Sequence, residues 1–130
     1  MKSVYFSQLM IVGAGGFIGS ALRFMIGGWA QRLAAAGVFP YGTLVVNVLG
    51  CLLIGFLGGL AEYRQALDPA QRLFLMIGVL GGFTTFSAFA FETLGLMQDA
   101  QVFKAIVNTG LQVILGFTAA FVGYLGARFI

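Results

Sequence analysis

Four apolar stretches, each long enough to cross a lipid bilayer, occupy nearly all of this 130-residue sequence. They cover residues 5–29, 42–61, 73–97 and 102–127, and one helical crossing requires about 20 mainly apolar residues. Because backbone groups in lipid must find their hydrogen-bond partners within the chain, such stretches fold as helices. We therefore expect an all-α fold, in which residues 1–130 form a single transmembrane domain of four helices.

Composition supports a membrane environment, since 60% of the residues are hydrophobic and 8% are charged, against about 25% charged residues in soluble domains. Lys2 precedes the first apolar stretch, as in a signal peptide, but that stretch is too long for one, and we expect an uncleaved helix. The connection 62–72 concentrates charge, and its Asp68-Pro69 pair predicts the start of a helix. The remaining connections are short turns.

The inventory of reactive side chains is small. The chain has no histidine, one cysteine and four acidic residues that do not gather on one face of one span. We therefore expect no enzymatic activity and no metal site built from side chains. Cys51 lies in an apolar stretch without a partner for a disulfide and is interpreted as a core residue. The seven basic residues are scattered, which argues against binding to nucleic acid.

Basic residues are divided almost evenly between the two sides of the membrane. Four crossings place both termini and the connection 62–72 on the same side. This division gives only a weak positive-inside bias, and we hypothesise that the chain inserts in both orientations and pairs with an inverted copy. The first side carries Lys2, Arg64, Arg72 and Arg128, and the other carries Arg32 and Lys104, with Arg23 near the end of the first span.

Polar residues inside the spans are informative because burying them in hydrocarbon is unfavourable unless they are paired or line a cavity. Asn47 and Gln112 lie near the middle of their spans. Their amide hydrogens could bind an anion, or the two side chains could bond across helices, and the sequence leaves both readings open. The full set is Arg23, Thr43, Asn47, Thr84, Thr85, Ser87, Glu92, Thr93, Asn108, Thr109, Gln112 and Thr118.

The centre of the third span is the most unusual segment, reading GGFTTFS at residues 81–87. Glycine, threonine and serine are poor helix formers in this arrangement, which predicts one half-helix ending near Gly81 and another starting near Thr84. A continuous helix with a glycine notch is the alternative. A break at this depth would expose carbonyls that suit a cation and amides that suit an anion.

Two further patterns concern packing and aromatic rings. GxxxG spacings at Gly15, Gly55 and Gly78 predict closely packed helices. Phe86 and Phe89 are three residues apart and share a helix face. The positive edges of their rings could face a small anion, although fourteen phenylalanines in this chain make ordinary packing the alternative.

Three segments together resemble the Fluc/CrcB family of fluoride ion channels, and the resemblance extends over the whole chain. They are GGFIGSALR at residues 15–23, GTLVVN at 42–47 and GGFTTFS at 81–87. The resemblance implies a fluoride-selective channel in the bacterial inner membrane that lets cytoplasmic fluoride leave passively. It also implies an inverted homodimer with two anion pathways along the subunit interface.

The resemblance also implies roles for individual residues. A structural sodium ion, which is not transported, would be held by the backbone carbonyls of Gly81 and Thr84. The anion pore would be lined by Asn47, Phe86 and Phe89, with Gln112 as the polar position of the fourth span. This sequence departs from the family pattern at Ala88, Ala90 and Gly116, where hydroxyl groups can occur. Further candidates for the pore or its vestibule are Arg23, Thr43, Thr85, Ser87 and Asn108.

The main alternative is a proton-coupled exporter of the small multidrug resistance type, also a four-helix dual-topology dimer. Such an exporter needs an acidic residue in its first span, and this first span has none. Glu92 in the third span is the only acidic residue within any crossing, and neither it nor Arg23 is assigned a role in conduction. A structural subunit that transports nothing would explain the glycines, but not the GGFTTFS segment.

Overall fold

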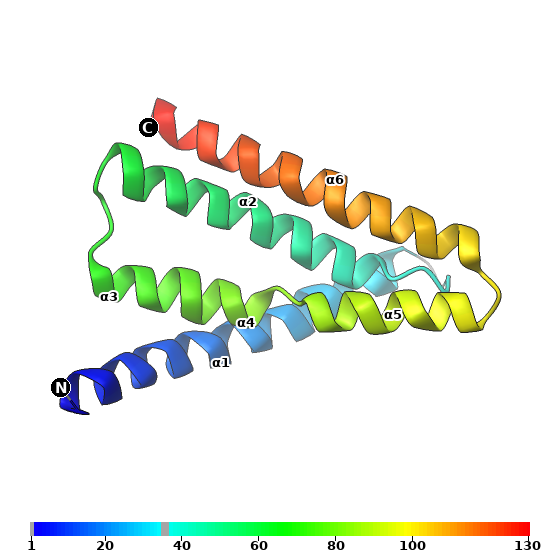
Figure 1. Cartoon of the computed structure of the whole chain (residues 1–130), viewed down its shortest axis with the longest axis horizontal. Coiled ribbons are helices and arrows are strands. Elements are labelled where there is room, and N and C mark those ends of the chain that lie inside the picture. The colour runs from blue at the N-terminus through cyan, green and yellow to red at the C-terminus, as the bar shows by residue number, and fades with distance from the viewer. Residues whose placement is uncertain (1, 35–36) are drawn as a thin grey trace.

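The computed structural model describes residues 2–34 and 37–130, and these residues form helices and short connections without a β-strand (Figure 1). Four helical segments are long and apolar enough to cross a membrane, which confirms the predicted all-α, four-span architecture. The elements are α1 (Lys2–Leu33), α2 (Tyr41–Tyr63), α3 (Pro69–Arg72), the π-helix η1 (Leu73–Leu80), α4 (Gly81–Phe83), α5 (Phe86–Gln98), α6 (Val102–Gly126) and the 3₁₀ turn η2 (Ala127–Phe129).

Both chain ends and the connection between α2 and α3 lie at one end of the bundle, as the four-crossing interpretation requires (Figure 1). The end of α1, the start of α2 and the connection between α5 and α6 lie at the opposite end (Figure 1). The side chain of Lys2, counted above on the side of the termini, is outside the described part of the chain. The basic residues described on that side are Arg64, Arg72 and Arg128.

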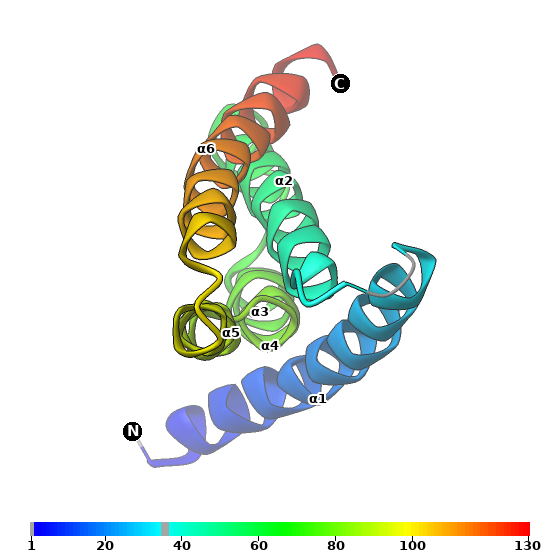
Figure 2. The same ribbon diagram turned by 90° about the vertical axis from the view of Figure 1, so that its right-hand side faces the viewer.

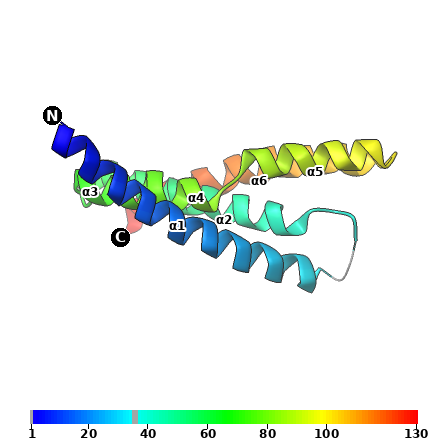
Figure 3. The same ribbon diagram turned by 90° about the horizontal axis from the view of Figure 1, so that it is seen from below.

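The four spans are packed unequally. Helices α2 and α6 contact each other along their length, and α1 packs against η1, α4 and α2. In contrast, α5 makes few contacts with α6 and α2 (Figures 2 and 3). A small apolar core forms where these elements meet, around the buried side chains of Val46, Leu80 and Phe83. The first half of the third span is therefore enclosed by helices, and its second half is much less so.

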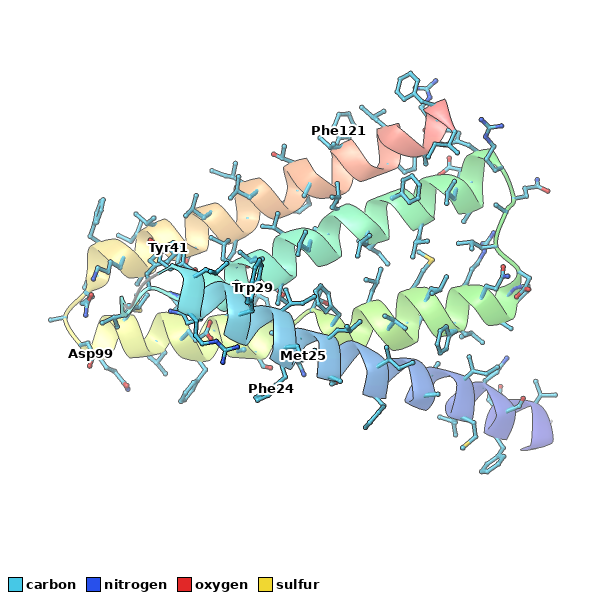
Figure 4. The ribbon with its side chains drawn as sticks, turned by 180° about the vertical axis from the view of Figure 1, so that it is seen from behind. Phe24, Met25, Trp29, Tyr41, Asp99 and Phe121 are labelled. Atoms are coloured by element: carbon cyan, nitrogen blue, oxygen red, sulfur yellow. The ribbon has the colours of Figure 1, made fainter. Side chains whose placement is uncertain are left out.

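Large apolar side chains cover the outside of the bundle. Phe24 is 84% exposed and Phe121 is 63% exposed, and Figure 4 shows both on the outer surface of their helices. Exposing such a surface to water is unfavourable, whereas exposing it to hydrocarbon is not, because lipid tails are as apolar as the side chains. The exposed surface therefore agrees with the four-span interpretation.

The predicted GxxxG glycines lie at the closest helix contacts. A Cβ atom added at Gly15 would lie 2.6 Å from the carbonyl oxygen of Phe74 and 2.9 Å from Cα of Gly78. One added at Gly55 would collide with the backbone of Ala120, and one at Gly59 would lie 2.7 Å from the carbonyl oxygen of Tyr124. At these positions the backbones of neighbouring helices touch, so no side chain fits between them.

The third span begins with the predicted cap. The amide of Gln71 donates to Oδ1 of Asp68 at 2.8 Å, and the amide of Asp68 donates to Oε1 of Gln71 at 3.0 Å. This reciprocal pair is a capping box, and Pro69 occupies the first turn. The Asp68-Pro69 prediction is confirmed.

Replacing Gly15 by alanine should destabilise the protein by about 1–3 kcal/mol, because the added methyl group would push α1 away from η1. Gly13→Ala is the matched control, since no heavy atom of a neighbouring element lies within 4 Å of a Cβ added there. Thermal unfolding of the purified protein in detergent measures the difference. Equal unfolding temperatures for the two variants would contradict the packing described for Gly15.

Candidate functional site

The third span is interrupted at Thr84 and Thr85, whose backbones are extended, with φ −83° and ψ 158° at Thr84 and φ −152° and ψ 116° at Thr85. The predicted break is confirmed, but the first half continues to Phe83 and the second begins at Phe86. Threonine bonds explain the displacement from Gly81. The amide and the hydroxyl of Thr84 each donate to the carbonyl of Leu80 at 3.0 Å and complete the last turn.

Thr85 starts the second half-helix. Its hydroxyl oxygen accepts a hydrogen bond from the amide of Ala88 at 3.1 Å, which is the usual bond of an N-cap residue. The same oxygen lies 3.3 Å from the hydroxyl of Ser87. The hydroxyl groups next to the break therefore serve the backbone and each other.

A single amide side chain satisfies both backbone groups of Thr85. Oδ1 of Asn47 accepts from the Thr85 amide at 2.8 Å, and Nδ2 of Asn47 donates to the Thr85 carbonyl at 3.0 Å. Nδ2 also donates to Oε1 of Gln112 at 3.1 Å. Asn47 thus joins α2, the break and α6. Of the two readings left open by the sequence, these bonds favour the cross-helix role for Asn47, because both of its N–H groups are engaged.

The amide nitrogen of Gln112, unlike that of Asn47, is not engaged in a hydrogen bond with any described residue. This atom, Nε2, is buried. An amide nitrogen carries two donor hydrogens, and burying them without a partner is unfavourable. Since Asn47 holds the oxygen end of the same amide, the free donors of Gln112 have a fixed orientation.

One cavity brings the four predicted pore residues together. It has a volume of about 490 Å³ and lies between α2, the interrupted third span and α6. The rings of Phe86 and Phe89 meet edge to face, with centroids 5.5 Å apart, and Phe86 is 78% exposed. The wall is mostly apolar and also contains Cys51 and Gly116. The predicted residues on this wall are Asn47, Phe86, Phe89 and Gln112.

A second cavity of about 300 Å³ lies on the other side of the break, and Arg23, Thr43 and Thr85 are on its wall. Thr85 also lines the first cavity and so separates the two. The hydroxyl of Thr43 donates to Oε1 of Glu92 at 2.7 Å, whereas Oε2 of Glu92 is buried without a partner among the described residues. The sequence analysis singled out Thr43 and Glu92 as polar residues within the spans, but it did not predict that they pair with each other.

Two of the further candidates line neither cavity. The exposed Ser87 has its hydroxyl next to that of Thr85. Asn108 is 0% exposed and lies between α5 and α6, where Nδ2 donates to the hydroxyl oxygen of Thr93 at 2.9 Å. Sequence spacing placed Asn108 one turn from Gln112, but the direction of its side chain depends on how α5 packs against α6.

The carbonyls at the end of the first half-helix are available as cation ligands. In a continuous helix the Thr85 amide would bond to the Gly81 carbonyl, but here it bonds to Asn47. No heavy atom lies within 4 Å of a Cβ added at Gly81, so the space beside this residue is open. The Thr84 carbonyl accepts a long bond of 3.4 Å from Nη1 of Arg23. Two carbonyl oxygens at a helix C-terminus suit a hard cation.

The architecture and the site define a class, that of small multi-pass membrane proteins whose third span is interrupted inside the bilayer. Residues 10–124 match the model of the family described as "CrcB-like protein, Camphor Resistance (CrcB)". Because this match covers most of the chain, the chain belongs to the CrcB-like family. The resemblance recognised from the three sequence segments is confirmed.

Curated relatives match nearly the full length. A protein of Nitratidesulfovibrio vulgaris is 42% identical over 123 residues, which are 95% of this chain and 98% of that protein. One of Elusimicrobium minutum is 46% identical over 126 residues, 95% of each chain. One of Thermus thermophilus is 47% identical over 117 residues, 90% of this chain and 91% of that protein. All three relatives are named fluoride-specific ion channel FluC.

Proposed function

We propose that this chain forms a fluoride-selective channel, which lets cytoplasmic fluoride leave a bacterial cell through the inner membrane. The observation that carries this proposal is its high similarity to relatives named as fluoride-specific channels. A membrane potential that is negative inside drives an anion outward without a coupled ion. The protein therefore needs a selective path and no chemical step.

The first cavity is the proposed anion path, and Gln112 is its main hydrogen-bond donor. Fluoride is small and strongly hydrated, so a path must replace its water by several weak donors without holding it too tightly. Nε2 of Gln112 is buried and free to donate, and Asn47 holds this amide in place. The edges of the Phe86 and Phe89 rings add weak positive charge on the same wall.

The departures from the family pattern increase the importance of Gln112. Gly116 lines the first cavity and Ala88 the second, and neither brings a hydroxyl group. The hydroxyl of Thr85 lies 3.3 Å from the hydroxyl of Ser87, and its oxygen accepts the amide of Ala88. We assign the second cavity, with Arg23 and Thr43, as a polar vestibule. Its arginine would attract anions to the path without contacting them inside it.

The complete channel is proposed to be a dimer of two inverted copies. Phe86 and Phe91 on α5 are each 78% exposed, and α5 makes few contacts within the subunit. A second subunit would cover this helix and close the first cavity. The near-even division of basic residues supports insertion in both orientations.

The carbonyls of Gly81 and Thr84 are the proposed ligands of a structural sodium ion. Their oxygen chemistry fits this ion, and the diverted Thr85 amide leaves the Gly81 carbonyl without its helical partner. When bound, sodium would supply a fixed positive charge at the interruption. The residues of this chain contribute the oxygen atoms, and Asn47 keeps the interruption open.

Liposomes that contain the purified protein should release fluoride passively and retain chloride. The expected result follows from a path that offers weak donors to an anion and needs no coupled proton. A fluoride electrode measures the release without an imposed proton gradient. Release that occurs only with a proton gradient would contradict a channel and favour the exporter.

Phe86→Ile and Phe89→Ile should each lower fluoride release about tenfold or more, because aliphatic side chains have no positive ring edge. Phe91→Ile is the matched control on the same helix, since Phe91 lines neither described cavity. Dimer content is measured by size-exclusion chromatography. Unchanged release from both cavity variants would remove the phenylalanines from the proposed path.

A reporter fused to the C-terminus should be found on both sides of the membrane, because the basic residues differ little between the two sides. Replacing Arg32 and Lys104 by glutamine should shift the reporter toward the cytoplasm, since the side of the termini then carries the excess of positive charge. Labelling with an impermeant reagent measures the distribution. A single orientation for the unmodified protein would contradict the inverted dimer.

Sodium should raise the unfolding temperature of the dimer relative to a large organic cation at equal ionic strength. Binding to the folded state alone stabilises it by about 2.7 kcal/mol when the ligand concentration is 100 times the dissociation constant. A thermal scan in the two salts measures the difference. An unfolding temperature that does not depend on the cation would exclude the proposed sodium site.

A further inference from the structure

Helix α5 carries both cavity phenylalanines but has little packing of its own. Of its thirteen residues only Leu96 is buried, and it makes few contacts with α6 and α2. Asn47 fixes the start of this helix by bonding to Thr85. The hydroxyl of Thr43 also donates to Glu92 on α5, so the bonds made by Asn47 and Thr43 tie α5 to α2 and not to α6. A bond between α5 and α6 is needed to fix the phenylalanine rings relative to Gln112.

Asn108 on α6 provides this bond. Its Nδ2 atom donates to the hydroxyl oxygen of Thr93 at 2.9 Å, and that hydroxyl donates to the carbonyl of Phe89 at 2.8 Å. The two bonds connect α6 to the turn of α5 that begins with Phe89. Asn108 is 0% exposed, so water does not compete for these bonds.

Packing alone does not explain an asparagine at this position. Oδ1 of Asn108 is buried and has no hydrogen-bond partner among the described residues. An unsatisfied buried carbonyl is destabilising, and leucine, which has a similar shape, would avoid that loss. The amide is therefore better explained by the bond it makes to Thr93 than by stability.

We propose that Asn108 is a positioning residue for the anion path, an inference that rests on the proposed fluoride function. Gln112 lies one turn further along α6 and on the same face of the helix. Asn108 fixes the turn of Phe89, while Gln112 bonds to Asn47. The polar network thereby sets the distance between the donor of Gln112 and the rings of Phe86 and Phe89. Asn108 acts through α5 and does not contact the anion.

The test uses variants of Asn108 and Thr93 that keep the shape of the side chain but remove the hydrogen bond between them. Asn108→Leu keeps the volume but removes the bond, so fluoride release per folded dimer should fall about tenfold, a typical coupling between contacting residues. The unfolding temperature should stay the same or rise. Thr93→Val should lower release in the same way, whereas Thr93→Ser, which keeps the hydroxyl, should retain it.

The double variant Asn108→Leu with Thr93→Val should be no worse than either single variant, because both remove the same bond. Thr109→Val is the matched control, since the hydroxyl of Thr109 bonds only to the Ala105 carbonyl of its own helix. Hydrogen exchange of the amides in α5 should become faster in Asn108→Leu and not in Thr109→Val.

The outcomes separate the inference from the proposed function. Fluoride release by the unmodified protein together with unchanged release by Asn108→Leu and Thr93→Val would overturn the positioning role alone. Release that falls only in proportion to a loss of folded dimer would also overturn it, because Asn108 would then serve stability. Absence of fluoride release from the unmodified protein would overturn the proposed function, and the positioning role with it.

Discussion

Backbone polar groups inside a membrane must be hydrogen-bonded, and the arrangement of this site follows from that requirement. The extended pair Thr84 and Thr85 interrupts the helical hydrogen bonds in the middle of the third span. The side chain of Asn47 satisfies the amide and the carbonyl of Thr85 by bonding to both. Because that side chain comes from α2, the interruption can exist only when α2 packs beside the third span. The local break therefore depends on the tertiary fold and forms together with it.

The same requirement determines which donors are left for an anion. The hydroxyl of Thr84 donates to the backbone, and the hydroxyl of Thr85 lies 3.3 Å from that of Ser87. Both N–H groups of Asn47 are engaged as well. Gln112 keeps a free amide nitrogen because Asn47 bonds only to its oxygen. A small number of weak, fixed donors in an apolar wall would allow an anion to enter and to leave.

Sequence patterns predicted what depends on neighbours along the chain. The four spans, the capping box at Asp68 and the close-packed glycines follow from local spacing, and the break follows from the GGFTTFS segment. Its position was predicted too early because the bonds of Thr84 to Leu80 extend the first half-helix. The bonds of Asn47 to Gln112 and of Asn108 to Thr93 could not be predicted, because they depend on the relative rotation of helices far apart in sequence.

The contrast between the two halves of the third span also has a mechanical meaning. Glycines on α1 and η1 bring two backbones into direct contact, so at those points no side-chain rotamer can rearrange to absorb a displacement. Helix α5, on the other side of the extended pair, is held by hydrogen bonds, which can lengthen or exchange at a smaller energetic cost. We therefore expect α1 and η1 to form the rigid part of the subunit and α5 to be its more mobile part. Thermal fluctuations that widen or narrow the cavity should then occur mainly in α5, which carries the two phenylalanine rings.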